Sequence, residues 1–121
     1  IMIKGNQIPF VNHKKSIIES MDLISKKGLG MALIRDDKKN IKGIFTDGDL
    51  RRIINKGINL KKIPIKDVMT KNFKFVYKDN LVVDIARVME EKKIYSLVVK
   101  DSGGKISGLI RMHEILEAKI I

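Results

Sequence analysis

Hydrophobic residues along the chain follow two different spacings. Two stretches, 17–27 and 81–92, repeat apolar residues every three or four positions, which predicts amphipathic helices. Short β-branched-rich runs bounded by turn residues predict strands between them. The pattern predicts the order strand, helix, strand, strand, helix, and it does so twice. The expected ranges are 8–11, 17–27, 31–35, 41–46 and 47–56, and then 73–77, 81–92, 96–100, 106–111 and 112–121.

An internal repeat underlies this order. A shift of 65 residues aligns 8–56 with 73–121 without a gap. Only six of the 49 aligned pairs are identical, but 17 pairs are apolar in both copies. Such a repeat predicts two copies of one structural unit. We therefore expect a mixed fold, α/β or α+β, of tandem β-α-β-β-α repeats packed as a pseudo-two-fold pair. The expected domains are 1–67, with a lead-in and a linker, and 68–121.

Local signals fix some expected boundaries. Ser16 and Glu19 form an S-x-x-E capping box before the first helix, and Gly28 suits its C-terminal end. Asn80 is the expected N-cap of the second helix. The Gly103-Gly104 pair predicts positive φ angles in the second hairpin turn. The linker 57–70 contains Pro64 and an expected helical turn over 66–69.

Composition narrows the class of protein. The chain has 121 residues, 44% hydrophobic and 32% charged, which is typical of a globular domain. It has no cysteine, so a disulfide scaffold, a thiolate zinc site and a cysteine nucleophile are excluded. No apolar run reaches the roughly 18 residues of a membrane span, so we expect no membrane partner and a cytoplasmic location. Because the sequence starts at Ile1, we interpret it as a piece of a longer protein.

The net charge of +11 raises the question of nucleic acid. Twenty of the 25 basic residues are lysine and aromatic residues make up 5%, whereas single-strand binders present aromatic platforms to the bases. The excess is also local, because residues 50–78 contain nine basic residues and one acid. We therefore expect a small phosphorylated ligand, attracted by a local field, in preference to nucleic acid.

The segment GIFTDGDLRR, residues 43–52, carries the clearest chemistry. A strand there runs into a helix N-terminus, which favours phosphate binding. Gly43 lets a ligand or another backbone approach, the Thr46 hydroxyl could donate to phosphate, and the Asp49 carboxylate could accept from a ribose diol. T-x-x-D is also a capping box, so Thr46 and Asp49 could equally serve only the helix end.

The second copy differs at the matching positions. Gly108, Arg111 and Glu114 replace the first triplet, so a guanidinium stands where the hydroxyl was. Arg111 could meet a phosphate and Glu114 a diol, or both could be solvated. We expect one competent site or two unequal ones, with His113 as a further ligand contact. His13 and His113 have no metal-binding partner in the sequence, and we expect neither a catalytic nor a metal site in this chain.

The chain resembles the cystathionine-β-synthase (CBS) domain pair. GIFTDGDLRR, the preceding SKKGLGM (25–31), the following IKDVMT (65–70) and the closing MHEILEAKII (112–121) carry the resemblance. More narrowly, it is similar to the CBS pair at the C-terminus of sugar-phosphate isomerases of the arabinose 5-phosphate type. The resemblance implies a regulatory module that binds an adenosyl nucleotide or a related ligand through Gly43, Thr46 and Asp49.

The resemblance also implies what the longer protein does. Its relatives carry a sugar-isomerase (SIS) domain, interconvert ribulose 5-phosphate and arabinose 5-phosphate, and serve the pathway to 3-deoxy-manno-octulosonate (Kdo) in lipopolysaccharide or capsule synthesis. The expected ligand is AMP, ATP or a CMP-sugar such as CMP-Kdo, no cofactor is required, and a homo-oligomer is expected. The alternatives are the CBS module of a sugar-nucleotide nucleotidyltransferase and a purely structural oligomerisation module.

Overall fold

The computed structural model describes residues 2–118 and forms two compact units. The first unit is Ile8–Phe73, and the second combines Ile1–Gln7 with Lys74–Ile121. The last three residues of the expected helix 112–121 lie outside the described residues. Whether the sequence motifs divide between residues 67 and 68 stays a prediction.

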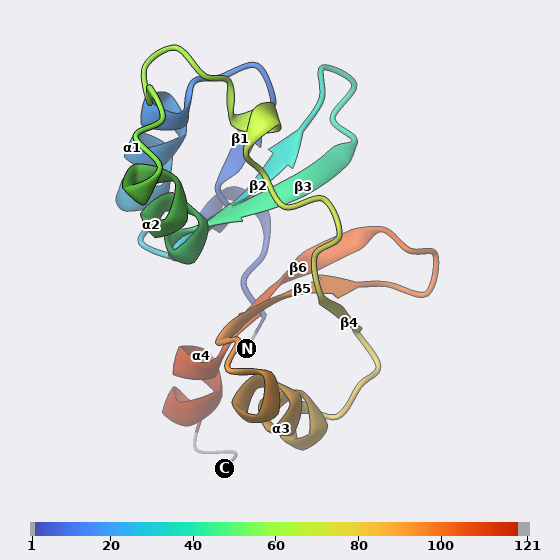
Figure 1. Cartoon of the computed structure of the whole chain (residues 1–121). Helices are drawn as coiled ribbons and strands as arrows, with labels where there is room; N and C mark the ends of the chain where they lie inside the picture. The colour runs from blue at the N-terminus through green and yellow to red at the C-terminus, as the bar shows by residue number, and fades with distance from the viewer. Residues whose placement is uncertain (1, 119–121) are drawn as a thin grey trace. The chain divides into compact units, whose positions relative to one another are not determined.

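The two units share one order of elements, which confirms the expected β-α-β-β-α repeat (Figure 1). The first contains β1 (Phe10–Asn12), α1 (Ile17–Lys27), β2 (Met31–Arg35), β3 (Ile41–Thr46), α2 (Asp47–Asn55) and the 3-10 turn η2 (Ile65–Asp67). The second contains η1 (Gly5–Gln7), β4 (Phe75–Tyr77), α3 (Val82–Lys92), β5 (Ser96–Lys100), β6 (Ile106–Arg111) and α4 (Met112–Glu117).

Each unit contains a three-stranded mixed sheet. In the first, β2 is central, parallel to β1 and antiparallel to β3. In the second, β5 is central, parallel to β4 and antiparallel to β6. The register is equivalent, since Ile34 pairs with Gly43 and Val99 with Gly108, each beside a register shift.

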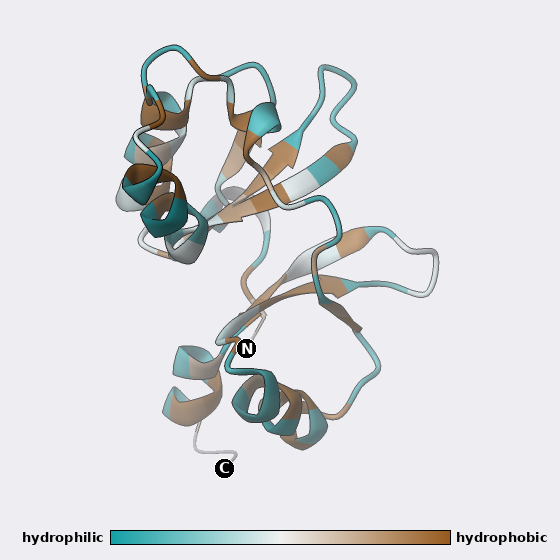
Figure 2. Ribbon diagram, in the orientation of Figure 1, coloured by the Kyte–Doolittle hydropathy of each residue, from teal (hydrophilic) through white to brown (hydrophobic). Residues whose placement is uncertain are grey.

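Each unit also has its own hydrophobic cluster beneath its helices. In the first, α1, α2 and η2 pack apolar residues against the sheet, and the fully buried Phe45 and Ile65 belong to this cluster. In the second, α3 and α4 do the same around Met89 and Ile115. Figure 2 shows hydrophobic residues along the strands and on parts of each helix, with hydrophilic residues at the loops.

A short segment that precedes β4 or β1, which we call the lead-in segment, adds an antiparallel bridge to the last strand of each unit. Thr70 pairs with Ile44 on β3, with backbone N–O distances of 2.8 and 2.9 Å. Ile3 pairs with Leu109 on β6, with distances of 2.7 and 3.0 Å. The second unit is therefore assembled from two segments far apart in the sequence, and the first from one.

Helix ends confirm most of the expected signals. Ser16 and Glu19 form the expected capping box, and Gly28 ends α1 in the left-handed conformation. The expectation for Asn80 is wrong, because Leu81 is the N-cap of α3 and has no side-chain cap bond. The Asn80 side chain instead accepts from the Tyr77 amide at 2.8 Å, which turns the chain after β4. The apolar spacing of residues 81–92 also predicts that Leu81 and Val88 are buried, and this is wrong, because both side chains are exposed.

The hairpin turns use one hydrogen-bond pattern with different residues. The Asp36 and Asp101 carboxylates each accept two amides of their own turn at 2.9 to 3.0 Å. At the fourth residue of each turn, counted from the aspartate, the backbone is left-handed, with φ of 67° at Lys39 and 81° at Gly104. Only Gly104 of the expected glycine pair therefore supplies a positive φ. Along residues 2–118, no helix has the length and apolar content needed to cross a membrane.

Candidate functional site

The β3–α2 junction forms the capping box expected from the sequence. The Asp49 amide donates to the Thr46 hydroxyl at 3.2 Å, and the Thr46 amide donates to the Asp49 carboxylate at 3.0 Å. Thr46 is in extended conformation, so the strand passes directly into the helix. Of the two interpretations left open, the capping role is present in the structure, and a ligand role for Thr46 and Asp49 stays a prediction.

Asp49 is almost fully buried, and its carboxylate is surrounded by donors. Its Oδ1 accepts from the Arg52 guanidinium one turn along α2. The Thr70 hydroxyl lies 3.3 and 3.4 Å from the two carboxylate oxygens. Arg52 itself is exposed, with 68% of its side-chain surface accessible. An exposed guanidinium therefore covers a buried carboxylate, and it is the neighbour that can move without opening the core.

Gly43 lies against a second backbone segment of the first unit. A Cβ atom at this position would lie 2.7 Å from the Thr70 carbonyl oxygen and 2.9 Å from the Met69 sulfur. A Cβ atom does not come this close to a non-bonded oxygen or sulfur atom, so the Ile44–Thr70 bridge requires glycine here. Gly108 has the same role, since a Cβ there would overlap the Ile3 carbonyl oxygen. Of the two uses expected for Gly43, approach by another backbone is present in the structure, and a ligand contact stays a prediction.

The first turn of α2 presents donors to the solvent side. The ideal Cβ position of Gly48 lies 3.6 Å from the Thr46 hydroxyl oxygen and 3.9 Å from the Arg52 Nη1 atom. A hydroxyl and a guanidinium therefore lie near the same position in the first turn of a helix, which is an arrangement that suits a phosphate oxygen.

At the β6–α4 junction the polar side chains pair with one another. Arg111 donates from Nε and Nη2 to the two Glu114 carboxylate oxygens at 2.7 and 2.6 Å. This hydrogen-bonded carboxylate raises the pKa of Arg111 above its usual value. Both side chains are about four-fifths buried. His113 lies outside this pair, exposed, with Nε2 2.8 Å from a Glu117 oxygen. Binding roles for these three residues stay predictions.

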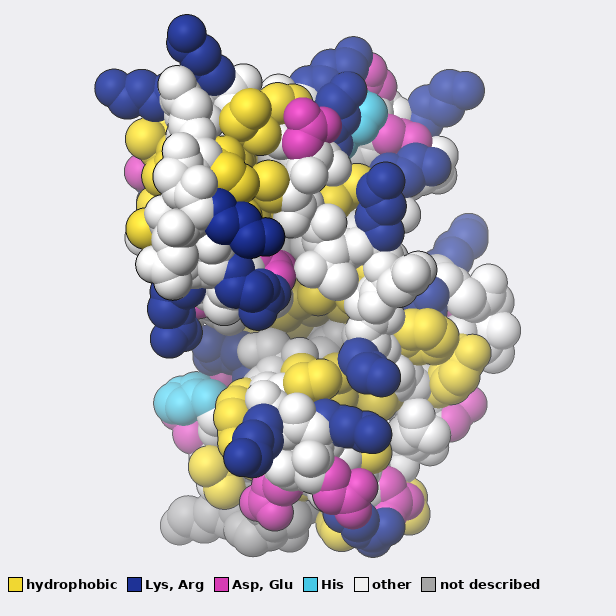
Figure 3. Space-filling model, viewed as in Figure 1, with side chains coloured by type: hydrophobic (Ala, Val, Ile, Leu, Met, Phe, Trp, Pro, Cys, Tyr) yellow, Lys and Arg dark blue, Asp and Glu magenta, His cyan; other side chains and the backbone are white. Residues whose placement is uncertain are grey.

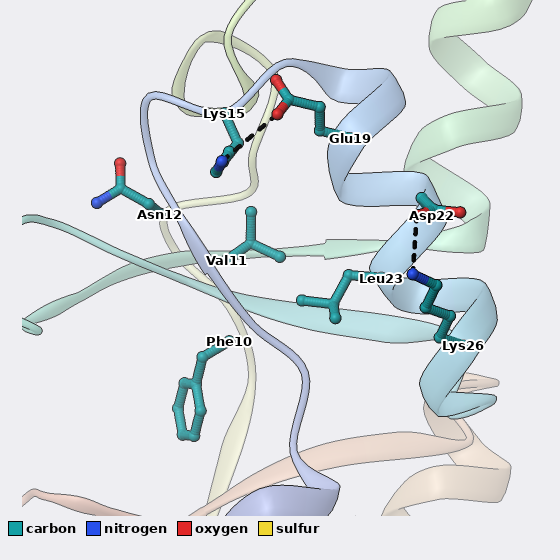
Figure 4. Close-up of a pocket in the computed structure, with 8 residues that line it drawn as sticks. All are labelled: Phe10, Val11, Asn12, Lys15, Glu19, Asp22, Leu23 and Lys26. Carbon is teal, nitrogen blue, oxygen red and sulfur yellow. Dashed lines mark hydrogen bonds and ion pairs between the residues drawn. The ribbon is translucent and has the colours of Figure 1, made fainter.

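A groove of about 330 Å³ lies between β1 and α1 in the first unit (Figure 4). Phe10, Val11 and Leu23 form its apolar surface. The ion pairs Lys15–Glu19 and Asp22–Lys26 border it at 3.5 and 3.4 Å. None of the candidate residues from the sequence lines it. Its charged groups are paired with one another, so it offers no convergent donor set.

Sequence reasoning missed Arg52 and Thr70 as parts of this site. Asp49 and Arg52 lie three residues apart on one helix, and this spacing is a recognisable signal for an ion pair. Thr70 is 21 residues from Asp49, and no local pattern reports that contact.

Comparison with known proteins agrees with the repeated fold. The CBS domain family matches the chain twice, at residues 1–56 and 65–120. Arabinose 5-phosphate isomerase KdsD of Yersinia pestis is 41% identical over all 121 residues, and the chain spans 37% of that relative's length.

Solved structures share the fold. A conserved protein of Pyrococcus horikoshii superposes with a TM-score of 0.85 at 26% identity, over 98% of this chain and 89% of its own. CBSX2 in complex with AMP superposes with a TM-score of 0.79 at 23% identity, over 98% and 92%. With the family matched over nearly its whole length in two copies, the chain belongs to the CBS domain family.

Proposed function

We propose that this CBS pair is a regulatory module that binds a nucleotide or nucleotide-sugar at the β3–α2 junction. The observation that carries the proposal is the position of the Thr46 hydroxyl and the Arg52 guanidinium, which both lie beside Gly48 in the first turn of α2. We assign the phosphate to these groups. Binding of AMP by the structural relative CBSX2 supports a nucleotide of this type.

The covered Asp49 carboxylate gives the module a means to respond. Arg52 turns toward the ligand phosphate, and the freed Asp49 oxygen accepts from the ribose diol. A ligand shifts a conformational equilibrium only by its different affinity for the two states. Exchange of the Arg52 contact for a ribose contact supplies such a difference. In the second unit Arg111 and Glu114 are both about four-fifths buried and bind each other through two hydrogen bonds, so we place the stronger site in the first unit.

We further propose that the chain is the regulatory part of a cytoplasmic arabinose 5-phosphate isomerase with an attached SIS-type isomerase domain. The KdsD relatives support this, since the whole chain aligns with 37% of their length. The ligand would then report the state of the pathway that consumes the isomerase product, and CMP-Kdo is a candidate beside AMP and ATP.

Isothermal titration calorimetry with AMP, ATP and CMP-Kdo tests the binding proposal. We expect one of the three to bind, and Arg52→Gln to weaken it at least about tenfold through loss of a charge-assisted hydrogen bond. Arg51→Gln is the matched control, since it removes the same charge from the neighbouring position of α2. Equal affinity in both variants, or no heat with any of the three ligands, contradicts the proposal.

A second candidate function, assembly of an oligomer, is favoured by apolar side chains on the helix surfaces. Ile18 on α1 and Ile54 on α2 are 41% and 51% exposed. Light scattering of the wild type and of Ile18→Lys/Ile54→Lys tests this candidate. A dimer that dissociates in the variant supports it, and a wild-type monomer at high concentration excludes it.

A further inference from the structure

A second polar hollow in the first unit shares no residue with the β3–α2 junction. Its volume is about 420 Å³, within the range of small-molecule sites. It lies where the loop between β1 and α1, the strand β3 and the linker around η2 meet. We name it the lysine pocket, and its lining residues are His13, Lys42, Lys66, Asp67, Met69 and Lys71.

Backbone hydrogen bonds hold the walls of the lysine pocket together. The His13 amide donates to the Arg35 carbonyl at 2.9 Å, and the His13 carbonyl accepts from the Lys66 amide at 3.1 Å. The Ile44–Thr70 bridge fixes the other wall, because Lys42 lies two residues before Ile44 on β3 and Lys71 directly follows Thr70. The donors are therefore carried on backbone that does not need to rearrange when a ligand binds.

The charge of the lysine pocket is only partly balanced. Asp67 is the one acid in the lining, against three lysines. Lys42 lies 3.8 Å from the Asp36 carboxylate, whereas Lys66 and Lys71 have no ion-pair partner in the part of the chain that the structure describes. Figure 3 shows Lys and Arg side chains gathered over the unit that contains α1 and α2. Like charges around one hollow create a field that attracts an anion.

His13 supplies an unsatisfied polar atom at the same place. Its Nε2 is buried and has no hydrogen-bond partner among the described residues. The Asp37 carboxylate oxygen is 4.0 Å away, which is too far for a hydrogen bond. A buried nitrogen without a partner is costly, and a turn of the His13 ring toward an oxyanion in the lysine pocket would provide one.

We propose that the lysine pocket binds the phosphate group of a small phosphorylated metabolite. Lysine ammonium groups act as point charges toward phosphate and leave its orientation open. No Phe or Tyr lines the pocket, so a nucleobase would find no stacking platform there. The proposal therefore concerns a ligand other than the nucleotide at the β3–α2 junction, and it is independent of the proposed function.

A titration of the ¹⁵N-labelled chain with inorganic phosphate, followed by NMR at constant ionic strength, tests the proposal. We expect saturating shifts of the amides of His13, Lys42 and residues 66–71. The double variant Lys66→Gln/Lys71→Gln should weaken binding about tenfold or more, through loss of two charge-assisted contacts. Lys61→Gln/Lys62→Gln is the matched control, because it removes the same charge from the same linker outside the pocket.

The outcomes separate the two proposals. Saturating shifts that are lost only in the Lys66/Lys71 variant, with its spectrum otherwise dispersed as in the wild type, support the lysine pocket. Equal weakening in both double variants indicates a general charge effect and overturns it, as does a titration that does not saturate. Arg52→Gln should leave the phosphate-induced shifts of His13, Lys42 and residues 66–71 as they are in the wild type, because Arg52 does not line the lysine pocket. Failure of the nucleotide site therefore leaves this result unchanged.

Discussion

The β3–α2 and β6–α4 junctions are built on the same frame but filled differently. Both place a glycine against a lead-in backbone and both lead from a buried strand into a helix. The first then uses Thr46 and Asp49 as a capping box, whereas the second uses an Arg111–Glu114 ion pair and has no side-chain cap. The fold thus requires the glycines and leaves the polar pair free to vary. A polar pair that the fold does not dictate is therefore a place to look for function.

The glycines test the shared frame, and their replacement should have the largest effect. Gly43→Val and Gly108→Val should each lower the free energy of unfolding by about 3 kcal/mol, because the lead-in backbone occupies the space of the new side chain. Urea unfolding measures the change. Gly48→Ala is the control, since its Cβ meets only ordinary contacts and alanine favours the helix. An unchanged free energy of unfolding in either valine variant would show that the two junctions do not share this requirement for glycine.

Replacement of the acidic residue at each junction should have the next largest effect, and the two losses of stability should differ. Asp49→Ala removes a buried carboxylate that receives the Thr46 amide and the Thr70 hydroxyl, and we expect a loss of about 2 kcal/mol. Glu114→Ala removes a carboxylate that is less buried than that of Asp49 and should cost about 1 kcal/mol. Thermal and urea unfolding give both values. Similar losses would mean that the two junctions differ in chemistry but not in their contribution to stability.

Two pairs of equivalent positions with positive φ hold glycine in one repeat and lysine in the other. Substitutions at these positions should change the stability by smaller amounts. Gly28 and Lys93 end the equivalent helices α1 and α3, and Lys39 and Gly104 occupy the equivalent turn position, all with positive φ. Lys39→Gly and Lys93→Gly should each raise stability by about 0.5 to 1 kcal/mol. Gly28→Lys and Gly104→Lys should lower it by a similar amount. A melting temperature that moves the other way in any of the four contradicts this account.

The capped helix α1 should show the smallest and most pH-dependent effect. Hydrogen bonds from the Ser16 amide and hydroxyl lower the pKa of Glu19 in the folded chain. The stabilisation is therefore complete above the unfolded-state pKa of about 4.3 and is lost as the pH falls through the lower folded-state pKa. Glu19→Gln should be less stable than the wild type at neutral pH, with the difference shrinking in acid. Melting temperatures from pH 7 down to about pH 3 measure it.

Ser16→Ala is the companion variant for this prediction. It removes the hydroxyl donor from the same carboxylate and should reproduce part of the Glu19→Gln difference. A difference between Glu19→Gln and wild type that stays constant from neutral pH into acid would mean that the box stabilises α1 without its charge.

Local sequence predicted those parts of the fold whose causes are local. The ranges of α1, β2, β3, β5 and β6 match the structure, because strong periodicity and turn residues bound them. The edge strand β1 was expected at 8–11 but spans Phe10–Asn12, since its ends depend on pairing with β2. At the site, the capping box was visible as a spacing. The contacts of Thr70 with Asp49 and Gly43 depend on the returning linker, which no short window contains.

The pairing of Ile3 with Leu109 has a consequence for how the chain folds. The first unit is contiguous, so all of its contacts close within residues 8–73. The second unit needs a segment before residue 8 to meet a strand more than a hundred residues later, with the whole first unit as the intervening loop. Closing that loop costs chain entropy, and contacts of long sequence separation slow folding. During synthesis the first unit can therefore fold alone, while residues 2–7 wait for β6 to leave the ribosome.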